Sequence, residues 1–149
     1  MLFRSECDEN VEHFEKHKKE IPSSFGETVE WHITKKGESY EWVADHCDLT
    51  AVTLRKLRED KIDDIKPITV LKFAIGMKLS YPYARDLITK AGINIERVSK
   101  QNAVLITVLT TFQRVGLIKT YRILRCNNQE EYLNLSERFI NKYIKKKTR

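Results

Sequence analysis

Residues that favour the start of a helix recur at short intervals between positions 24 and 80, so no helix in that part of the chain can be long. A side chain that accepts a hydrogen bond from a free backbone N–H is favoured just before a helix, and proline is favoured in the first turn. Residues of these two kinds stand at five places: Ser24, Ser39, Thr50, Pro67 and Ser80. This spacing predicts five short helices over residues 23–93, joined by connections of a few residues.

The apolar residues within these segments repeat at helical intervals. In residues 81–91, apolar side chains fall at i, i+3, i+4 and i+7, and Gly92 follows where glycine commonly ends a helix. Leu54 and Leu57 point to one side of the third segment, and Cys47 lies on the inward side of the second. Each segment therefore has a face to bury, as a compact bundle of short helices requires.

The segments on either side of this unit are also predicted to be helical. Residues 8–20 form an amphipathic segment that Pro22 ends. The run AVLITVLTTF, residues 103–112, is β-branched enough for a strand, but its spacing and the helical context favour a helix. Further helices are expected over 116–126 and 129–147. The predicted fold class is all-α, with three parts: residues 1–22, 23–93 and 94–149.

Composition excludes several classes of protein. The 149 residues are 41% hydrophobic and 32% charged, which is ordinary for a soluble globular domain. No run approaches the ~18 consecutive apolar residues that span a bilayer, and the N-terminus lacks the apolar centre of a signal peptide. Three cysteines at unrelated spacings indicate neither a disulfide framework nor a metal site. We therefore expect a cytoplasmic protein that has no membrane partner.

The net charge of +6 is concentrated in one part of the chain. Residues 1–118 contain equal numbers of basic and acidic side chains, whereas residues 119–149 contain nine basic and three acidic ones. This last segment ends in KYIKKKTR, which suits contact with phosphates and equally suits a solvated tail. Residues 23–93, by contrast, carry eleven basic and eleven acidic residues and are therefore neutral.

The sequence HFEKH is the one fragment that looks like part of an enzyme. It places His13 and His17 at i and i+4, from where two imidazoles can bind zinc on one helix face. A zinc peptidase needs the glutamate directly after the first histidine, but here it is Glu15, two residues on. No third ligand, activated nucleophile, glycine-rich phosphate loop or carboxylate pair accompanies it. The sequence therefore predicts a protein that is not an enzyme and that uses no metal or cofactor.

Residues 39–60 contain the features of a helix-turn-helix. A predicted helix over 39–47, a turn through Asp48 and Leu49 and a second helix over 50–60 occupy the second and third places among five. Over residues 24–80 the chain resembles the Cro/CI-type, or xenobiotic-response-element, DNA-binding domains of phage and Gram-positive bacterial regulators. Ala44 matches the small residue that lets the two helices cross closely, and IKPITVLKFAIGMKL matches the proline-led fourth helix. The resemblance implies a five-helix, lambda-repressor-like domain with additional N- and C-terminal helices.

The resemblance also implies how such a protein contacts double-stranded DNA. A major groove about 12 Å wide admits one helix, whose N-terminal residues face the base edges while the preceding helix crosses the phosphates. Carried over to this sequence, the base-contacting residues are Ala51, Val52, Arg55 and Lys56. The phosphate-contacting residues are Tyr40, Thr50 and Lys61. We expect a transcription regulator, and specifically a repressor, that binds DNA as a homodimer and uses residues 94–149 for dimerisation or for an effector.

A protein-interaction module on the same fold is the alternative that the residues leave open. Ala51 and Val52 are apolar, and the segment that follows the second helix is acidic, with Glu59, Asp60, Asp63 and Asp64. Such a module would be an antitoxin-like partner or the detached C-terminal part of a peptidase–regulator. The placement of charge separates the two functions, because DNA binding needs the basic residues on the exposed face and a protein partner is favoured if the acidic ones lie there.

Overall fold

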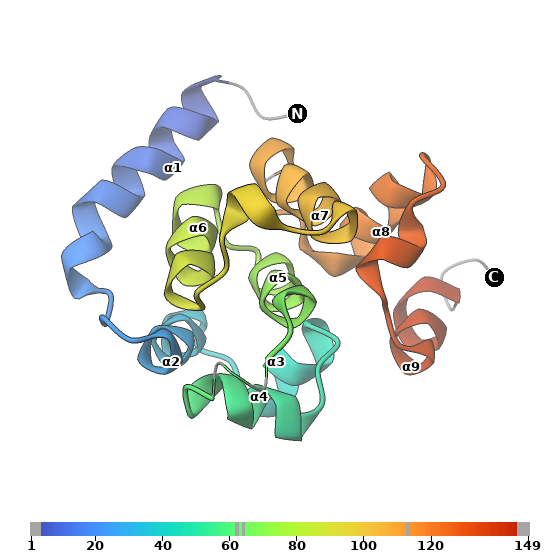
Figure 1. Cartoon of the computed structure of the whole chain (residues 1–149), viewed down its shortest axis with the longest axis horizontal. Helices are drawn as coiled ribbons and strands as arrows, with labels where there is room; N and C mark the ends of the chain where they lie inside the picture. Colours follow the sequence, from blue (N-terminus) through green and yellow to red (C-terminus); the bar gives the residue numbers. More distant parts are fainter. Residues whose placement is uncertain (1–3, 62, 64, 113, 146–149) are drawn as a thin grey trace.

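The computed structural model describes residues 4–145 except 62, 64 and 113, and all the regular structure in those residues is helical (Figure 1). The prediction of an all-α fold is therefore confirmed. The α-helices are α1 (Arg4–His17), α2 (Phe25–Lys36), α3 (Tyr40–His46), α4 (Ala51–Arg58), α5 (Pro67–Gly76), α6 (Tyr81–Lys90), α7 (Lys100–Thr111), α8 (Gly116–Arg125) and α9 (Glu137–Phe139). The shorter elements are the 3-10 turns η1 (Lys18–Glu20), η3 (Ile95–Arg97) and η4 (Glu130–Leu133), and the π-helical turn η5 (Ile140–Ile144), which continues α9.

Local hydrogen bonds define where the helices of residues 23–93 begin. Before α2, α3 and α4, the hydroxyls of Ser24, Ser39 and Thr50 accept backbone N–H groups of the helix at 3.3, 3.1 and 3.0 Å. Pro67 is the first residue of α5, and Ser80 directly precedes α6. All five helices begin where predicted. The side-chain cap is present at Ser24, Ser39 and Thr50, whereas the side chain of Ser80 makes no capping hydrogen bond.

The last part of the chain differs from its prediction. A single helix over 129–147 is wrong, because η4 ends at Leu133 and Asn134 then adopts a φ of +50°. Ser136 begins a new helix by accepting the N–H of Phe139 at 3.2 Å. Asn134 and Ser136 also bind buried groups elsewhere in the fold, as described below, and these contacts fix the break. The two helices predicted before it are confirmed as α7 and α8, including the choice of helix over strand.

α5 is the centre of the hydrophobic core. Every residue from 70 to 76 is buried, and Figure 1 shows α3 and α4 below α5, α6 on one side and α7 and α8 on the other. α1 lies at the edge of the molecule against α6. The same core cluster includes eight residues from the 94–149 segment: Leu105, Ile106, Val108, Leu109, Leu117, Leu124, Leu133 and Phe139. Residues on both sides of the predicted boundary at residue 93 therefore share one core. Whether the two sides unfold separately is not tested by the structure, so the boundary stays a prediction.

The end of α3 lies against the end of α5 at a position that only glycine fits. A Cβ atom on Gly76 would lie 2.6 Å from the Sγ of Cys47 and 2.8 Å from its Cα. Cys47 is fully buried, as predicted, and burial raises the pKa of its thiol, so that the thiol stays neutral and packs as a small apolar group. This contact places the turn that follows α3 directly against α5.

α2 carries a buried histidine whose Nε2 atom has no hydrogen-bond partner within the described residues. His32 is 5% exposed, and its ring meets Tyr83 of α6 edge to face, with the ring centroids 5.7 Å apart. Burial, and to a smaller extent the charge of Lys90, lowers the pKa of His32 to about 4. His32 is therefore neutral at pH 7 and packs as a mostly apolar ring.

This buried imidazole makes stability depend on pH. The unfolded chain takes up a proton at the ordinary histidine pKa near 6.5, whereas the folded chain takes it up only near 4. Between these values the unfolded state binds more protons, so lowering the pH from 7 to 4 removes about 3 kcal/mol of the free energy of unfolding. Urea unfolding of the chain and of His32→Gln at a series of pH values measures this contribution. The same slope in both proteins would contradict the assignment to His32.

Candidate nucleic-acid interface on α3 and α4

Residues 47–50 separate α3 from α4 and form a mostly buried turn. The N–H of Leu49 donates to the carbonyl of Ala44 at 2.8 Å, and Leu49 itself is buried. Asp48 has a φ of +52°, in the left-handed region that Asp and Asn tolerate better than most residues. The turn is therefore a defined structure that fixes α4 relative to α3.

The side chain of Asp48 joins this turn to two other parts of the fold. One carboxylate oxygen accepts Lys72 Nζ of α5 at 2.9 Å and the N–H of Ser136 at 2.6 Å, and the other accepts the Ser136 hydroxyl at 2.5 Å. Lys72 also donates to the carbonyl of Asn134 at 3.1 Å. The side chains of Asp48 and Lys72 are 2% and 9% exposed, so water does not screen the ion pair. We refer to Asp48, Lys72, Asn134 and Ser136 as the turn lock.

The first turn of α4 presents a surface without carboxylates. Of the predicted base-contacting residues, Ala51, Val52 and Arg55 are exposed and Lys56 is half-buried. Val52 is 51% exposed, and with Tyr40 of α3 it is one of three large apolar side chains that are exposed in the described residues. The structure therefore brings the predicted base-contacting residues together at the exposed start of one helix. Their contact with DNA stays a prediction.

Tyr40, a predicted phosphate contact, is exposed but already engaged. Its hydroxyl donates to Glu30 Oε1 of α2 at 2.5 Å, and the guanidinium of Arg58 lies 3.6 Å from the centre of its ring. Arg58 also pairs with the same oxygen of Glu30 at 3.3 Å. The hydrogen bond to Glu30 raises the pKa of the Tyr40 phenol, which therefore keeps its proton. No sequence signal indicated this cluster, because its three residues come from three different helices.

The other two predicted phosphate contacts differ in how free they are. Thr50 caps α4, and its hydroxyl also donates to Thr53 Oγ1 at 2.9 Å. Lys61 is exposed, with its Nζ 3.6 Å from a carboxylate oxygen of Glu59. An exposed pair of this kind is weak and is easily replaced by a phosphate. Lys61 is therefore available to an anionic partner in a way that Thr50 is not.

The acidic segment after α4 is partly structural. Asp60 has a φ of +63°, and its carboxylate accepts the N–H of Gly26 at the start of α2 at 3.0 Å. A Cβ atom on Gly26 would lie 2.6 Å from the carbonyl oxygen of Arg58, so α2 and the end of α4 meet through their backbones. Asp63 is exposed, and Asp64 lies outside the described residues. Asp60 thus serves the packing of α4 on α2, and because its partner is a neutral N–H it keeps its negative charge at the end of α4.

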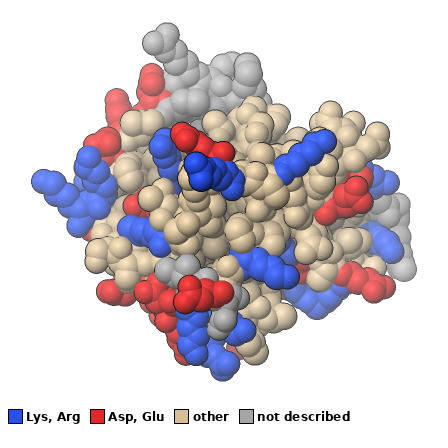
Figure 2. Space-filling view, in the orientation of Figure 1, with Lys and Arg blue, Asp and Glu red and all other residues tan. Residues whose placement is uncertain are grey.

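Two basic residues of the C-terminal segment, Arg138 and Lys142, bind Asp45 of α3. Asp45 accepts Arg138 at 2.7 Å and Lys142 at 3.0 Å, and the hydroxyl of Tyr143 donates to the same carboxylate. Partial burial raises the pKa of Asp45, but these hydrogen bonds outweigh it and lower the pKa to about 2. Figure 2 accordingly shows basic and acidic side chains interspersed over the visible face. The tail residues 146–149 lie outside the described residues.

No protein-family model matches the sequence, and no curated protein or solved structure matches it either. Among the described residues, no single helix is long and apolar enough to cross a membrane, although α7 and α8 together reach the length and composition across a bend of 114°. In the same residues no three His, Cys, Asp or Glu side chains are placed to share a metal ion. His13 instead bonds the Tyr83 hydroxyl at 2.7 Å, and His17 pairs with Glu20 at 2.7 Å. The fold thus defines an all-α protein with an exposed helix after a locked turn.

Proposed function

We propose that this chain is a sequence-specific DNA-binding regulator of transcription, acting as a repressor, that inserts α4 into the major groove. The observation that carries the proposal is the exposed, carboxylate-free first turn of α4, placed after a short buried turn. A helix docks in a major groove with its N-terminal residues against the base edges, so this end of α4 is the part that has to be exposed and free of negative charge.

The exposed side chains of α4 suit base edges chemically. Arg55 can donate two hydrogen bonds to O6 and N7 of guanine, and the methyl groups of Val52 and Ala51 can contact thymine methyls. Lys61 follows the helix and can bind a phosphate without regard to sequence. Rigid placement of α4 also supports the proposal, because a reading helix has to hold its register on the duplex.

A selection from a random duplex library tests this function. Enriched and scrambled duplexes are then titrated against the chain by fluorescence anisotropy at several salt concentrations. We expect a short, dyad-symmetric motif, as a homodimer on two half-sites requires, bound at least ~10³-fold tighter than scrambled DNA. If no motif is enriched and the remaining binding is weak and steeply salt-dependent, specific recognition is ruled out.

Arg55→Ala separates base contact from phosphate contact. We expect it to cost about 1–3 kcal/mol on the selected motif and to relax the preference at one base pair, because the guanine loses its donor. Lys61→Ala should instead weaken binding to all sequences alike and reduce the salt dependence. Arg125→Ala on α8 is the matched control, since Arg125 is also exposed but lies outside α3 and α4. Equal losses for Arg55→Ala and Arg125→Ala would contradict the role of α4.

A protein-interaction module is favoured by one observation, the engagement of Tyr40 with Glu30. A phosphate at the start of α3 would meet the Glu30 carboxylate, whereas an apolar partner could bury Tyr40 and Val52 together. A photo-crosslinking amino acid at position 52 distinguishes the two functions in cell extract. Crosslinks to DNA support the regulator, and a single discrete protein adduct with no DNA adduct supports the module.

A further inference from the structure

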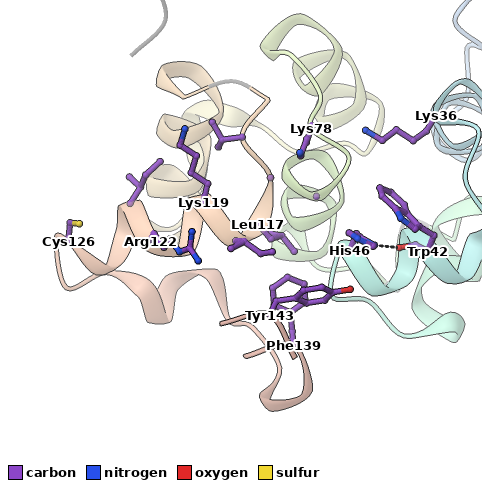
Figure 3. Close-up of a pocket in the computed structure, with 15 residues that line it drawn as sticks. Lys36, Trp42, His46, Lys78, Leu117, Lys119, Arg122, Cys126, Phe139 and Tyr143 are labelled. Atoms are coloured by element: carbon purple, nitrogen blue, oxygen red, sulfur yellow. Dashed lines mark hydrogen bonds between the residues drawn. The ribbon is translucent and has the colours of Figure 1, made fainter. Parts of the chain in front are cut away.

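A groove of about 690 Å³ lies between α3, α8 and the C-terminal segment. Figure 3 shows Trp42 and His46 of α3 on one side, Leu117 of α8 on another, and Phe139 and Tyr143 beneath them. Most of these side chains are apolar or aromatic, so the floor of the groove is largely apolar. The volume falls within the range of about 300–1,000 Å³ that is typical of small-molecule sites.

The same groove is lined by four cations and no carboxylate. The cations are Lys36 at the end of α2, Lys78 in the turn between α5 and α6, and Lys119 and Arg122 on α8. In the described part of the chain none of the four has an ion-pair partner. α3 carries two carboxylates, and that of Asp45, next to His46, is already bound to Arg138, Lys142 and Tyr143. The groove therefore has an unneutralised positive charge above an apolar floor.

We propose that this groove binds a small amphipathic anion, with a carboxylate or phosphate group on an apolar body. The head neutralises cations that the protein itself leaves unpaired, through hydrogen bonds strengthened by charge. The apolar body covers the lining side chains that are still half-buried, such as Ile118, Ile123 and Tyr143, and these gain from leaving water. A bare anion gains nothing from the floor, and a neutral apolar molecule leaves the cations unpaired, so both parts are needed.

Single-stranded nucleic acid also binds basic grooves that contain aromatic residues, by stacking bases on the rings. In this groove the Trp42 ring is already stacked on His46, with centroids 3.9 Å apart and planes inclined by 17°. The ammonium of Lys36 also lies over the Trp42 ring, 5.8 Å from its centroid. A base would have to displace one of these groups, whereas an alkyl or aryl anion can use the floor and leave them in place. The occupant favoured by these contacts is therefore small and amphipathic.

Trp42 gives the groove its own optical signal. The chain has two tryptophans, and Trp31 lines a different pocket, together with His32 and Tyr83. In a Trp31→Phe background, the fluorescence of Trp42 reports the groove alone. We titrate this protein with decanoate and decyl phosphate below their micelle concentrations, and with 1-decanol and inorganic phosphate as the neutral and the headgroup-only probes. We expect saturable changes with one or both amphiphiles, at least tenfold weaker binding of decanol, and no response to phosphate.

Paired variants test the role of charge. Lys119→Gln with Arg122→Gln removes two cations that line the groove, and we expect at least tenfold weaker binding of the amphiphile. Lys100→Gln with Arg125→Gln changes the net charge equally at exposed positions outside the groove and should leave binding unchanged. An equal loss in both pairs would show a general charge effect and would overturn the proposal. Urea unfolding of each variant checks that these exposed substitutions leave the fold intact.

Other occupants give other results. Equal affinity for decanol and decanoate would indicate an apolar site and would overturn the proposal. The absence of any response to either amphiphile up to millimolar concentration would also overturn it. Displacement of decanoate by an equimolar oligonucleotide would identify a nucleic-acid groove. Sedimentation that shows a dimer broken by Ile118→Glu would place a second copy there and would overturn the proposal. Adding decanoate to the unmodified chain should change amide chemical shifts mainly on α3 and α8, and this result would support the proposal without any variant. The proposed groove ligand does not depend on the proposed DNA binding.

Discussion

Replacing Asp48 by alanine is expected to lower the free energy of unfolding by about 3–5 kcal/mol, because it leaves the Lys72 ammonium buried without its counter-ion. The two side chains are almost fully buried, and Asp48 also accepts two hydrogen bonds from Ser136. Alanine is in addition less tolerant of the left-handed backbone that Asp48 adopts. Urea unfolding followed by circular dichroism at pH 7 measures the loss.

The double variant Asp48→Asn with Lys72→Met is the control for this prediction. It removes both charges, keeps a residue that tolerates a positive φ at position 48, and fills the lysine's volume with an apolar side chain. We expect it to be more stable than Asp48→Ala or than Lys72→Met alone, because no uncompensated charge remains. A loss below about 1 kcal/mol for Asp48→Ala would mean that the turn lock contributes little to stability.

Phe139→Ala is expected to lower the free energy of unfolding by about 3–5 kcal/mol. We also expect the described part of the chain to unfold in a single transition. Phe139 is 1% exposed and belongs to the same core cluster as residues of α2 to α6. Tryptophan fluorescence reports α2 and α3, where both tryptophans lie, and circular dichroism reports all helices. Coincident curves from the two signals show one cooperative unit.

Val11→Ala on α1 is the matched control for the loss of a core side chain. Val11 is 50% exposed, so removing its methyl groups should change stability by no more than about 0.5 kcal/mol. Two separated transitions, with Phe139→Ala shifting only the circular dichroism signal, would establish residues 94–149 as an independent domain. The predicted boundary at residue 93 would then mark a real division of the chain.

The sequence was sufficient where structure depends on near neighbours. The start of α3 follows from Ser39, whose hydroxyl caps an N–H three residues away, and the exposed start of α4 follows from the spacing of Leu54 and Leu57. The final helix was mispredicted because its break depends on distant partners. Ser136 binds Asp48, 88 residues earlier, and no local pattern in 129–147 indicates that contact.

The candidate sites show the same limit. Exposure of Val52 and Arg55 could be predicted from helical periodicity, but the engagement of Tyr40 with Glu30 and Arg58 could not, because these residues meet only when three helices pack. The cationic groove was missed for the same reason. Lys36, Lys78, Lys119 and Arg122 are scattered along the sequence, and each by itself resembles an ordinary solvated lysine or arginine.

The turn lock also ties the chain's architecture to the order of its synthesis. A ribosome adds about 5–20 residues per second, so Ser136 follows Asp48 by about 4–18 s. During that interval α3 and α4 can form, but the Asp48 and Lys72 charges have no complete set of partners to bury them. A chain interrupted before residue 136 therefore has α4 packed on α2 and α3 but lacks the Ser136 hydrogen bonds that complete the turn lock. Synthesis past residue 136, and not the formation of the two helices, therefore sets the moment at which the turn between α3 and α4 gains its full set of hydrogen bonds.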